Sequence, residues 1–407
     1  MQSDISHLDS KYSWRRLILT LWVSIIANVG VWAIVVIMPA VQNEFGVDRG
    51  TVSLPYALTM VGFGLGNLFF GRIVDRNGAF VALIIGILFV VSGFFISIIV
   101  DSMLAFIVVQ MIVGFGTGAS FGPLIADISQ WFYKKRGIAV SIVASGNYLA
   151  GAVWPILLSG VLEESGWRAV YLSLICLLII GALPIVIFLR KKAPAVRLSD
   201  SPQKKMENFK INLSKGSLTF CLALAGFCCC VAMSMPQVHM ISYCYDLGFG
   251  QIIGGQLLSL MLLGGVLSRV ISGFIVDILG GIKTVLIGSS LQAFALFLFL
   301  PFDGLISLYI VSLVFGLSQG GIVPSYAIIV REFLPSGEAG VRIGTIIMTT
   351  IIGMAFGGWL SGWLFDLTGS YKMAFYNGIV WNVANILIML LLFGKSSLAY
   401  RKQSVIS

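Results

Sequence analysis

Long apolar runs dominate this chain of 407 residues and recur along it from Leu17 to Phe393. Hydrophobic residues make up 58% of the sequence and charged residues 11%, whereas a soluble domain carries about 25% charged residues. An α-helix needs roughly 20 residues to cross the hydrocarbon core of a bilayer. Twelve segments approach that length: residues 17–41, 51–72, 79–100, 103–127, 138–161, 169–189, 217–242, 251–276, 283–300, 305–330, 341–364 and 373–394. The sequence therefore predicts an all-α integral membrane protein with twelve transmembrane helices.

The basic residues predict an orientation for these helices. With the N-terminus in the cytoplasm, 22 of the 26 Lys and Arg residues fall in cytoplasmic segments, and Arg269 falls within a span. Three fall outside: Arg49, Arg168 and Lys372. Because Lys and Arg are enriched in cytoplasmic loops, we expect both termini in the cytoplasm and the chain in the plasma or inner membrane. This placement accounts for the net charge of +9 without a nucleic-acid partner. The first sixteen residues are polar and the first run is long enough to span, so we expect no cleavable signal peptide.

The two halves of the chain resemble each other. Residues 190–216 form a long polar segment, which we expect to be a cytoplasmic linker between a six-helix bundle at 1–189 and another at 217–407. The segment Gly71-Arg-Ile-Val-Asp75-Arg76-Asn-Gly78 returns 202 residues later as Gly273-Phe-Ile-Val-Asp277-Ile-Leu-Gly280. Two further echoes follow in the same order: Gly114…Pro123 with Gly316…Pro324, and Gly166 with Gly369. Parallel repeats of this kind underlie transporters that rock two halves about a central site.

The segment 71–78 resembles the loop signature of the major facilitator superfamily, G-x-L-a-D-r-x-G, with Ile73 in place of the usual leucine. A narrower resemblance is to the monocarboxylate and oxalate–formate type porters. Residues 236–248 are similar to their P-x-x-H-L-x-x-Y-x-x-D-x-G pattern, residues 131–139 to their WF-x-x-R-R-G-x-A, and Arg269 stands four residues before Gly273 as their intramembrane arginine does. The resemblance implies the major facilitator fold, with spans one, four, seven and ten lining a cavity and spans five and eight beside it.

Three positions depart from the pattern of those porters. Gly265 stands where the animal monocarboxylate carriers place an aspartate. The first-span lysine of those carriers has no counterpart, because residues 17–43 carry no charge. Oxalate-type porters carry a lysine in the eleventh span, and this chain has none between Ile343 and Leu364. The proton-coupling machinery of the animal carriers therefore cannot be transferred whole, and a dianionic substrate is disfavoured.

Arg269 is the only charged residue between Gln251 and Val276. A cation at the centre of a membrane helix costs roughly 2.5–3.5 kcal/mol or more, so such a residue usually faces protein or a wet cavity. Its planar guanidinium suits a carboxylate, which it grips through two parallel hydrogen bonds. The alternative is that Arg269, roughly 10 Å from the end of its predicted span, extends toward the interface or pairs with Asp277 or Asp127. We favour substrate binding.

His239 is the only histidine in a predicted span. It can take up a proton near neutral pH and couple it to the substrate. The alternative is a neutral histidine that is hydrogen-bonded within the bundle or belongs to the outer gate. The resemblance adds polar and aromatic residues at mid-depth as candidates for substrate binding, although interhelical packing explains each of them equally well. They are Asn28, Trp32, Asn147, Tyr148, Ser318, Gln319 and Tyr326.

A further group of residues stands at the cytoplasmic ends of helices: Gly71, Arg72, Asp75, Arg76, Asp127, Asp277 and Arg331. We expect them to act as a gate, through ion pairs and helix-terminus contacts that hold one state closed at the inside. The expected pairs are Asp127 with Arg72 or Arg76, and Asp277 with Arg331. The alternative is charge that is merely solvated.

The sequence contains no phosphate-binding G-x-x-x-x-G-K-[ST] loop, no catalytic cluster and no metal-ligand spacing. We therefore expect neither an enzyme nor a cofactor. The prediction is a monomeric secondary active transporter of a small organic monocarboxylate, lactate- or pyruvate-like, taken up with a proton. The alternatives are an anion exchanger of the oxalate–formate type and a drug or metabolite exporter of the same fold. A sensor or scaffold would be expected to carry a large soluble domain, and none is evident in the sequence.

Overall fold

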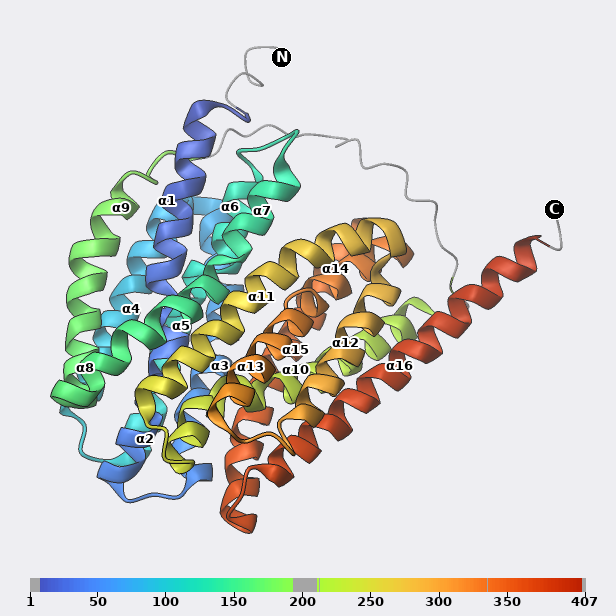
Figure 1. Ribbon diagram of the computed structural model, residues 1–407. Coiled ribbons are helices and arrows are strands. Elements are labelled where there is room, and N and C mark those ends of the chain that lie inside the picture. The colour runs from blue at the N-terminus through green and yellow to red at the C-terminus, as the bar shows by residue number, and fades with distance from the viewer. Residues whose placement is uncertain (1–7, 193–210, 212, 335, 405–407) are drawn as a thin grey trace. The chain divides into compact units, whose positions relative to one another are not determined.

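The computed structural model describes residues 8–192, 211, 213–334 and 336–404 (Figure 1). Over those ranges the secondary structure is helical, with no strand. The helices are α1 (Lys11–Ala27), α2 (Val29–Phe45), α3 (Arg49–Asn77), α4 (Ala79–Ile99), α5 (Met103–Thr117), α6 (Gly122–Ser129), α7 (Arg136–Ala144), α8 (Gly146–Cys176), α9 (Leu183–Ile187), α10 (Lys215–Asp246), α11 (Gln251–Leu279), α12 (Gly281–Leu298), α13 (Leu305–Gln319), α14 (Ile322–Phe333), α15 (Ser336–Thr368) and α16 (Lys372–Ser404). A 3-10 turn, η1 (Gly118–Ser120), follows α5, and a π-helical turn, η2 (Leu177–Ala182), follows α8.

The described residues contain 11 helical stretches that are long and apolar enough to cross a membrane. One of these stretches, residues 136–187, is 52 residues long and covers two predicted spans. Gly166 divides it, because its φ of 78° and ψ of 172° are not helical. The all-helical membrane fold predicted from the sequence is confirmed.

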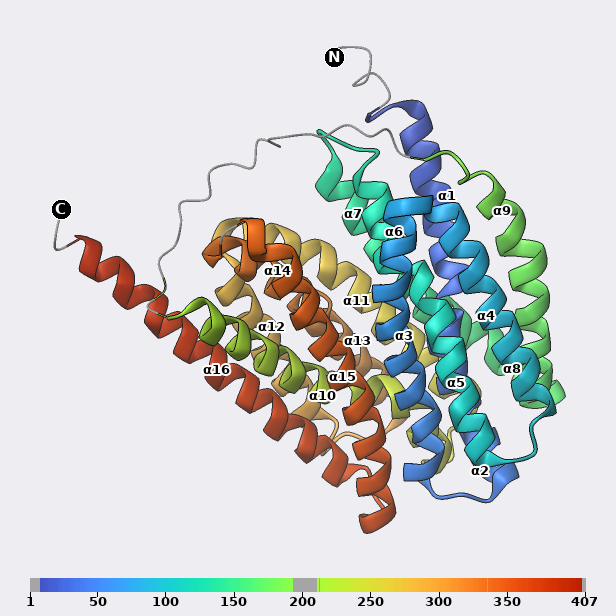
Figure 2. The same cartoon turned by 180° about the vertical axis from the view of Figure 1, so that it is seen from behind.

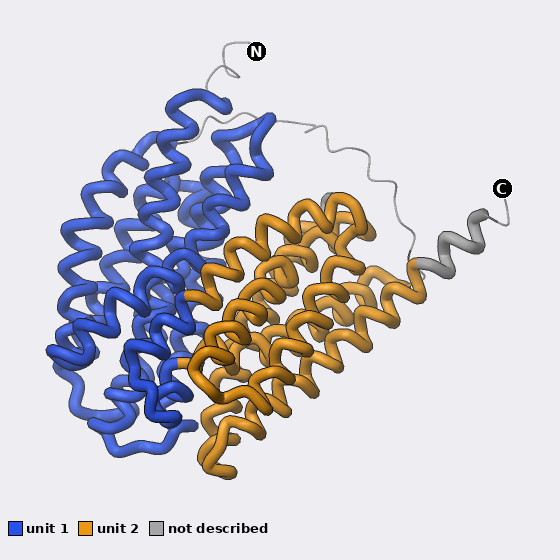
Figure 3. Tube along the Cα trace, viewed as in Figure 1, with its two compact units in different colours: residues 1–201, 241–259 blue, residues 202–240, 260–407 orange. Residues whose placement is uncertain are grey.

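The internal contacts of the chain define two compact units (Figure 3). Unit 1 comprises residues 1–201 with 241–259, and unit 2 comprises residues 202–240 with 260–407. The turn between α10 and α11, with the helix ends beside it, therefore packs with the N-terminal helices. Most of the predicted linker, residues 193–210 and 212, lies outside the described residues, and the predicted division at 190–216 stays a prediction.

Four of the predicted spans are interrupted within their length. Asn28 separates α1 from α2, residues 118–121 separate α5 from α6, Ser145 separates α7 from α8, and residues 320–321 separate α13 from α14. A helix end leaves backbone N–H and C=O groups without helical partners, and within a bilayer the protein itself must satisfy them. Polar side chains are therefore expected to gather at these breaks.

The backbone repeats at the offset seen in the sequence. Gly78 and Gly280 precede α4 and α12 with φ of 87° and 81° and the same ψ of 168°. Residues with a Cβ rarely adopt such a positive φ, so the turn favours glycine in both copies. Two further pairs of glycines share a positive φ, Gly46 with Gly248 and Gly166 with Gly369.

Two other glycines, also 202 residues apart, bring helix backbones together. A Cβ on Gly114 of α5 would collide with the carbonyl oxygen of Thr59 in α3, and a Cβ on Gly316 of α13 would collide with that of Met261 in α11. Small residues allow this close approach between membrane helices. The packing of α3 on α5 in unit 1 thus recurs as α11 on α13 in unit 2, which sets the surroundings of Arg269.

Candidate substrate-binding site

Arg269 lies in α11, ten residues before that helix ends at Leu279. At 1.5 Å per residue this is about 15 Å from the helix end, because α11 continues three residues past the predicted span end at 276. The side chain is half-buried, and its Nε donates a hydrogen bond to the carbonyl oxygen of Gly320 at 3.3 Å. A guanidinium holds five N–H donors in one planar fork, and the bond from Nε ties that plane to the carbonyl of Gly320. Two-point binding of a carboxylate depends on such a plane.

This contact lies at the break between α13 and α14. A Cβ on Gly320 would collide with the carbonyl oxygen of Gly265 and lie 2.9 Å from the amide nitrogen of Arg269. The backbone of α11 therefore passes directly against the break. Gly265, which stands where the animal monocarboxylate carriers place an aspartate, is buried in this helix crossing.

Gln319 is the last residue of α13 and is fully buried beside Gly320. Its Oε1 accepts a hydrogen bond from Nε2 of Gln237 in α10 at 2.7 Å. The two amides tie α10 to the same break that Arg269 contacts. Gln237 was missed at the sequence level, although it stands two residues before His239 in the segment that carries the family resemblance.

His239 is fully buried in unit 2 and bridges α10 to two other elements. Its Nε2 lies 2.7 Å from the carbonyl oxygen of Gly358, and its Nδ1 lies 3.0 Å from the hydroxyl of Tyr371. A carbonyl only accepts, so Nε2 carries the proton of a neutral ring, and Nδ1 accepts from the Tyr371 hydroxyl. This arrangement matches the alternative given for His239, a neutral histidine that is hydrogen-bonded within the bundle. It also identifies Nδ1 as the ring atom that would receive a proton.

Three of the candidates in unit 1 form one polar cluster at the breaks in the first, fourth and fifth spans. Asn28 is fully buried; its Nδ2 donates to the carbonyl oxygens of Ser24 at 2.8 Å and Ser120 at 3.3 Å. Its Oδ1 accepts from Nδ2 of Asn147 at 3.0 Å. The indole Nε1 of Trp32 donates to the backbone oxygen of Asn147 at 3.0 Å. These bonds join the first span to the fourth and the fifth at their breaks.

The remaining candidates differ in their surroundings. Tyr148 follows Asn147 in α8 and is buried. Ser318 donates to the carbonyl oxygen of Phe315, one turn earlier in its own helix, at 2.6 Å. Tyr326 is fully buried in the hydrophobic core of unit 2, and its hydroxyl donates to Oδ1 of Asn385 in α16 at 2.8 Å. The bonds of Ser318 and Tyr326 are those of helix packing, and their contact with substrate stays a prediction.

Asp127 pairs with Arg16, which corrects the expectation of Arg72 or Arg76. Nε and NH2 of Arg16 donate to the carboxylate at 2.9–3.1 Å, and NH1 donates to the carbonyl oxygen of Leu189 at 3.2 Å. The Arg16 guanidinium also lies 4.6 Å from the ring centroid of Trp131. Both charges are almost fully buried, which explains why the partner comes from α1 and not from the exposed end of α3.

The other proposed gate residues are mostly exposed. Asp75, Arg72 and Arg76 lie on the exposed end of α3, beside Gly71. Asp277 and Arg331 are both exposed, and among the described residues they form no ion pair with each other. The expected pairing of these two is therefore not observed. The buried acid at that end of unit 2 is instead Glu332, whose Oε1 accepts from the backbone N–H of Gly281 at 2.9 Å and caps α12.

A second ion pair, between Arg49 and Asp246, was not predicted. Arg49 begins α3, Asp246 ends α10, and NH2 of the arginine lies 3.0 Å from Oδ1 of the aspartate. In the same unit, a Cβ on Gly255 in α11 would lie 3.0 Å from the carbonyl oxygen of Pro155 in α8. These contacts hold the α10–α11 turn on the N-terminal helices. The signal for the pair was present, because Asp246 belongs to the segment that carries the family resemblance.

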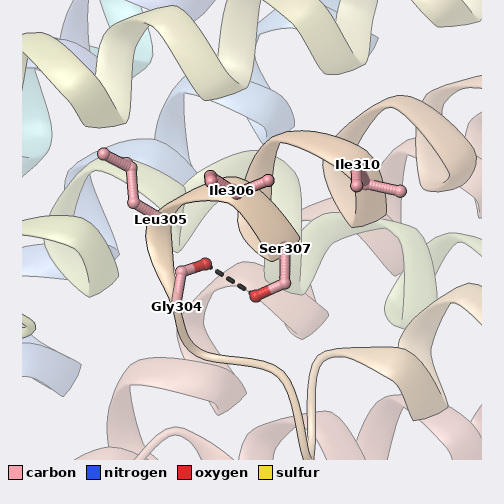
Figure 4. A pocket seen from close by; sticks show the side chains of 5 residues that line it. All are labelled: Gly304, Leu305, Ile306, Ser307 and Ile310. Atoms are coloured by element: carbon pink, nitrogen blue, oxygen red, sulfur yellow. Dashed lines mark hydrogen bonds between the residues drawn. The ribbon is translucent and has the colours of Figure 1, made fainter.

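A hollow at the start of α13 does not belong to the site (Figure 4). It is lined by Gly304, Leu305, Ile306, Ser307 and Ile310, none of which is charged. The hollow lies at the N-terminal end of α13. Gly320, which Arg269 contacts, follows the C-terminal end of that helix, about 20 Å away. The hydroxyl of Ser307 is engaged by the carbonyl oxygen of Gly304 at 2.7 Å.

Membrane-spanning helices, two copies of one backbone pattern, and polar side chains gathered at helix breaks define a class of protein, the helical transporters built from two related halves. The chain belongs to the Major Facilitator Superfamily, whose model matches residues 20–341 and 222–404. It is accordingly a transport protein for a small molecule and not an enzyme.

Relatives in this superfamily differ in what their names say they carry. An MFS-type transporter of Gibberella moniliformis is 26% identical over 350 residues, which cover 84% of this chain and 82% of the relative. The agnestins efflux protein AgnL12 of Paecilomyces divaricatus is 23% identical, with 79% of this chain and 73% of the relative covered. Monocarboxylate transporter 13 of Rattus norvegicus is 24% identical, with 66% of this chain and 62% of the relative covered.

Solved structures share the fold. A mutant of the nucleoside transporter NupG aligns with a TM-score of 0.73 at 14% identity, covering 93% of this chain and all (100%) of that chain. A bacterial homolog of the human lysosomal transporter Spinster aligns with a TM-score of 0.69 at 13% identity, covering 97% of this chain and 98% of that chain. At these identities the likeness concerns the fold alone.

Proposed function

We propose that this transporter moves a small organic monocarboxylate, such as lactate, pyruvate or a related short-chain acid, and that Arg269 binds its carboxylate. The observation that carries the proposal is a half-buried cation about 15 Å from the end of α11, whose Nε donates to the Gly320 carbonyl at the break between α13 and α14. A planar guanidinium forms two strong parallel hydrogen bonds with a carboxylate. The similarity to a monocarboxylate transporter supports this class of substrate.

Other substrate contacts are assigned by the family resemblance, on the spans that it puts beside the transport path. In unit 1 they are Asn28, Trp32, Asn147 and Tyr148, and in unit 2 they are Ser318, Gln319 and Tyr326. Amide and indole donors suit the oxygens of a small acid, and the apolar walls of these spans suit its short carbon chain. Gln237 joins this set, because its amide positions the side chain of Gln319.

Coupling to a proton runs through His239 in this proposal. Protonation at Nδ1 reverses the bond with Tyr371, because Nδ1–H then donates to the hydroxyl oxygen that had donated to it. A buried imidazolium is costly without an anion, so binding of the carboxylate and of the proton would favour each other. Proton symport follows from that linkage.

Transport proceeds by alternating access, with both termini in the cytoplasm and the protein acting as a monomer in the plasma or inner membrane. Gly71, Arg72, Asp75 and Arg76 of the first repeat and Asp277 and Arg331 of the second form the inner gate. The inner gate also includes Asp127, which is already held within unit 1 by Arg16. The excess of basic residues in the predicted cytoplasmic segments supports the orientation.

A thermal-shift screen of the purified protein tests the substrate class. The screen compares lactate, pyruvate, acetate, longer hydroxy acids, oxalate and several amine drugs, because stabilisation grows with the ratio of ligand concentration to dissociation constant. Short monocarboxylates are expected to raise the melting temperature, oxalate less, and amines not at all. A shift produced by amines alone would contradict the proposal.

A second candidate is export of an organic acid or related metabolite through the same site. The observation in its favour is the similarity to a relative named as an efflux protein. Substrate accumulation in proteoliposomes, measured under inward and outward proton gradients, separates uptake from export. Export predicts accumulation driven by a proton gradient opposite to the one that drives uptake, and oxalate–formate type exchange predicts accumulation that needs an internal anion and no gradient.

A further inference from the structure

α1 exposes one stripe of side chains along its length: Lys11, Arg15, Ile18 and Trp22. Intervals of four, three and four residues place these side chains on one face of a helix. The two cations occupy the first turns, and the apolar pair follows with 56% and 54% of the side chains exposed. The order along the stripe, charge at the helix end and apolar surface below it, matches the order of a phospholipid from headgroup to acyl chain.

The chain after α9 adds a third cation to this stripe. α9 lies beside α1 in both views (Figures 1 and 2). Nζ of Lys191 lies 5.1 Å from the ring centroid of Tyr12 on α1. The carbonyl oxygen of Leu189 accepts from Arg16 at 3.2 Å, which fixes this segment to α1. Ile187 and Phe188, just before it, are exposed.

Among the described residues, no ion pair joins an acid to Lys11, Arg15 or Lys191. The described acid nearest to them in the sequence is Asp9, which is bonded elsewhere. Both carboxylate oxygens of Asp9 are engaged by the backbone N–H groups of the loop before α7. Oδ2 accepts from Tyr133 at 3.2 Å and from Lys134 at 2.9 Å, and Oδ1 accepts from Lys135 at 3.1 Å. Three cations, Lys11, Arg15 and Lys191, outnumber this single acid, so the surface that they form carries a net positive charge.

We propose that an anionic phospholipid binds along this surface. Its phosphate contacts Lys11, Arg15 and Lys191, and its acyl chains lie on Ile18, Trp22, Ile187 and Phe188. Basic residues at the end of a membrane helix attract anionic lipids, and tryptophan is enriched where headgroups meet acyl chains. The proposal concerns lipid on unit 1 and is independent of the transported substrate.

Native mass spectrometry of the full-length protein in neutral detergent tests it, with phosphatidylglycerol and phosphatidylcholine of identical chains as probes. The wild type is expected to bind the anionic lipid in preference. Lys11→Gln, Arg15→Gln and Lys191→Gln are each expected to weaken its binding about fivefold, and the triple variant roughly a hundredfold. A matched control removes the same charge from exposed positions of unit 2 with Lys283→Gln, Lys372→Gln and Lys395→Gln, and is expected to bind as the wild type does.

Two further arms separate lipid from other sources of the signal. Trp22→Ala, which keeps every cation, is expected to weaken binding of long-chain phosphatidylglycerol by removing apolar contact. Inorganic phosphate at the same concentration is expected not to displace the lipid. Equal loss in both triple variants, no preference for the anionic lipid, or full displacement by inorganic phosphate would each overturn the proposal.

Discussion

Arg269 occupies in the second repeat the position that Asn67 occupies in the first, 202 residues earlier. Both side chains lie against a break in the neighbouring span. Oδ1 of Asn67 accepts from the backbone N–H of Gly122 at 2.8 Å, and Nε of Arg269 donates to the carbonyl oxygen of Gly320 at 3.3 Å. Each repeat thus places a polar side chain at its break, but one has an amide and the other a cation. This difference is the reason that we propose an anion site at the second break and not at the first.

Asn67→Ala is expected to destabilise the protein by about 1 kcal/mol, because the first N–H of α6 then loses its acceptor. Substrate affinity should change little, since the amide meets backbone within unit 1. Chemical unfolding in detergent measures the loss. Thr345→Ala, which removes an exposed hydroxyl bonded within its own helix, is the matched control. An equal effect of both changes would contradict the capping role.

The fold was predictable because length and hydropathy alone specify membrane helices. The repeat was predictable because glycines recur at its turns, and the structure gives Gly78 and Gly280 the same backbone conformation. The offset that reveals the repeat would also have pointed from Arg269 to Asn67. Helix breaks such as that at Asn28 were not predicted, since apolar runs continue through them.

Side-chain partners were harder to predict than spans. The predicted spans place Asp127, Arg72 and Arg76 at the same, cytoplasmic ends of helices, yet Asp127 pairs with Arg16. Burial decides this, because a buried carboxylate needs a cation that is also removed from water. Hydropathy patterns do not show which helices pack together, and so they do not identify that cation.

The buried pair of Arg16 and Asp127 predicts a large loss on removing one partner. Asp127→Asn or Arg16→Gln leaves an uncompensated buried charge and is expected to cost about 3–5 kcal/mol of stability. The double change Arg16→Met with Asp127→Leu is expected to recover most of it, because no charge remains. Thermal unfolding in detergent measures the series.

Glu338 supplies the control for that series, because its ion pairs with Lys215 and Arg342 are more exposed. Glu338→Gln is expected to leave the melting temperature almost unchanged. If removal of either buried charge had as little effect, the proposed stabilising role of the Arg16–Asp127 pair would be wrong.

Asp246 is expected to hold the α10–α11 turn on α3 through Arg49. Asp246→Asn weakens that contact, so amide hydrogen exchange should rise in residues 241–259 and stay unchanged in α12. The exchanged pair Arg49→Asp with Asp246→Arg should restore much of the protection. Exchange that is insensitive to the single change would show that packing at Gly255 alone holds the turn.

His239→Gln is expected to retain saturable binding of the carboxylate, without the gain in affinity that protonation of His239 gives, and to abolish proton movement coupled to it. A glutamine keeps hydrogen-bonding capacity toward Gly358 but cannot take up a proton near neutral pH. Proteoliposomes that contain a pH-sensitive dye measure acidification on adding substrate. Tyr371→Phe is the companion variant, because it removes the hydroxyl at Nδ1 and leaves the histidine. Substrate-driven acidification by His239→Gln at the wild-type rate would exclude His239 as the coupling residue.

Radiolabelled lactate and pyruvate uptake into proteoliposomes tests the binding role of Arg269 most directly. The wild type is expected to show saturable uptake. Arg269→Lys keeps the charge but loses the planar fork and should lower kcat/KM about tenfold, and Arg269→Ala should lower it about a hundredfold. Lys283→Gln, which removes an exposed cation elsewhere, should transport as the wild type does. Saturable uptake that survives unchanged in both Arg269 variants would contradict the account.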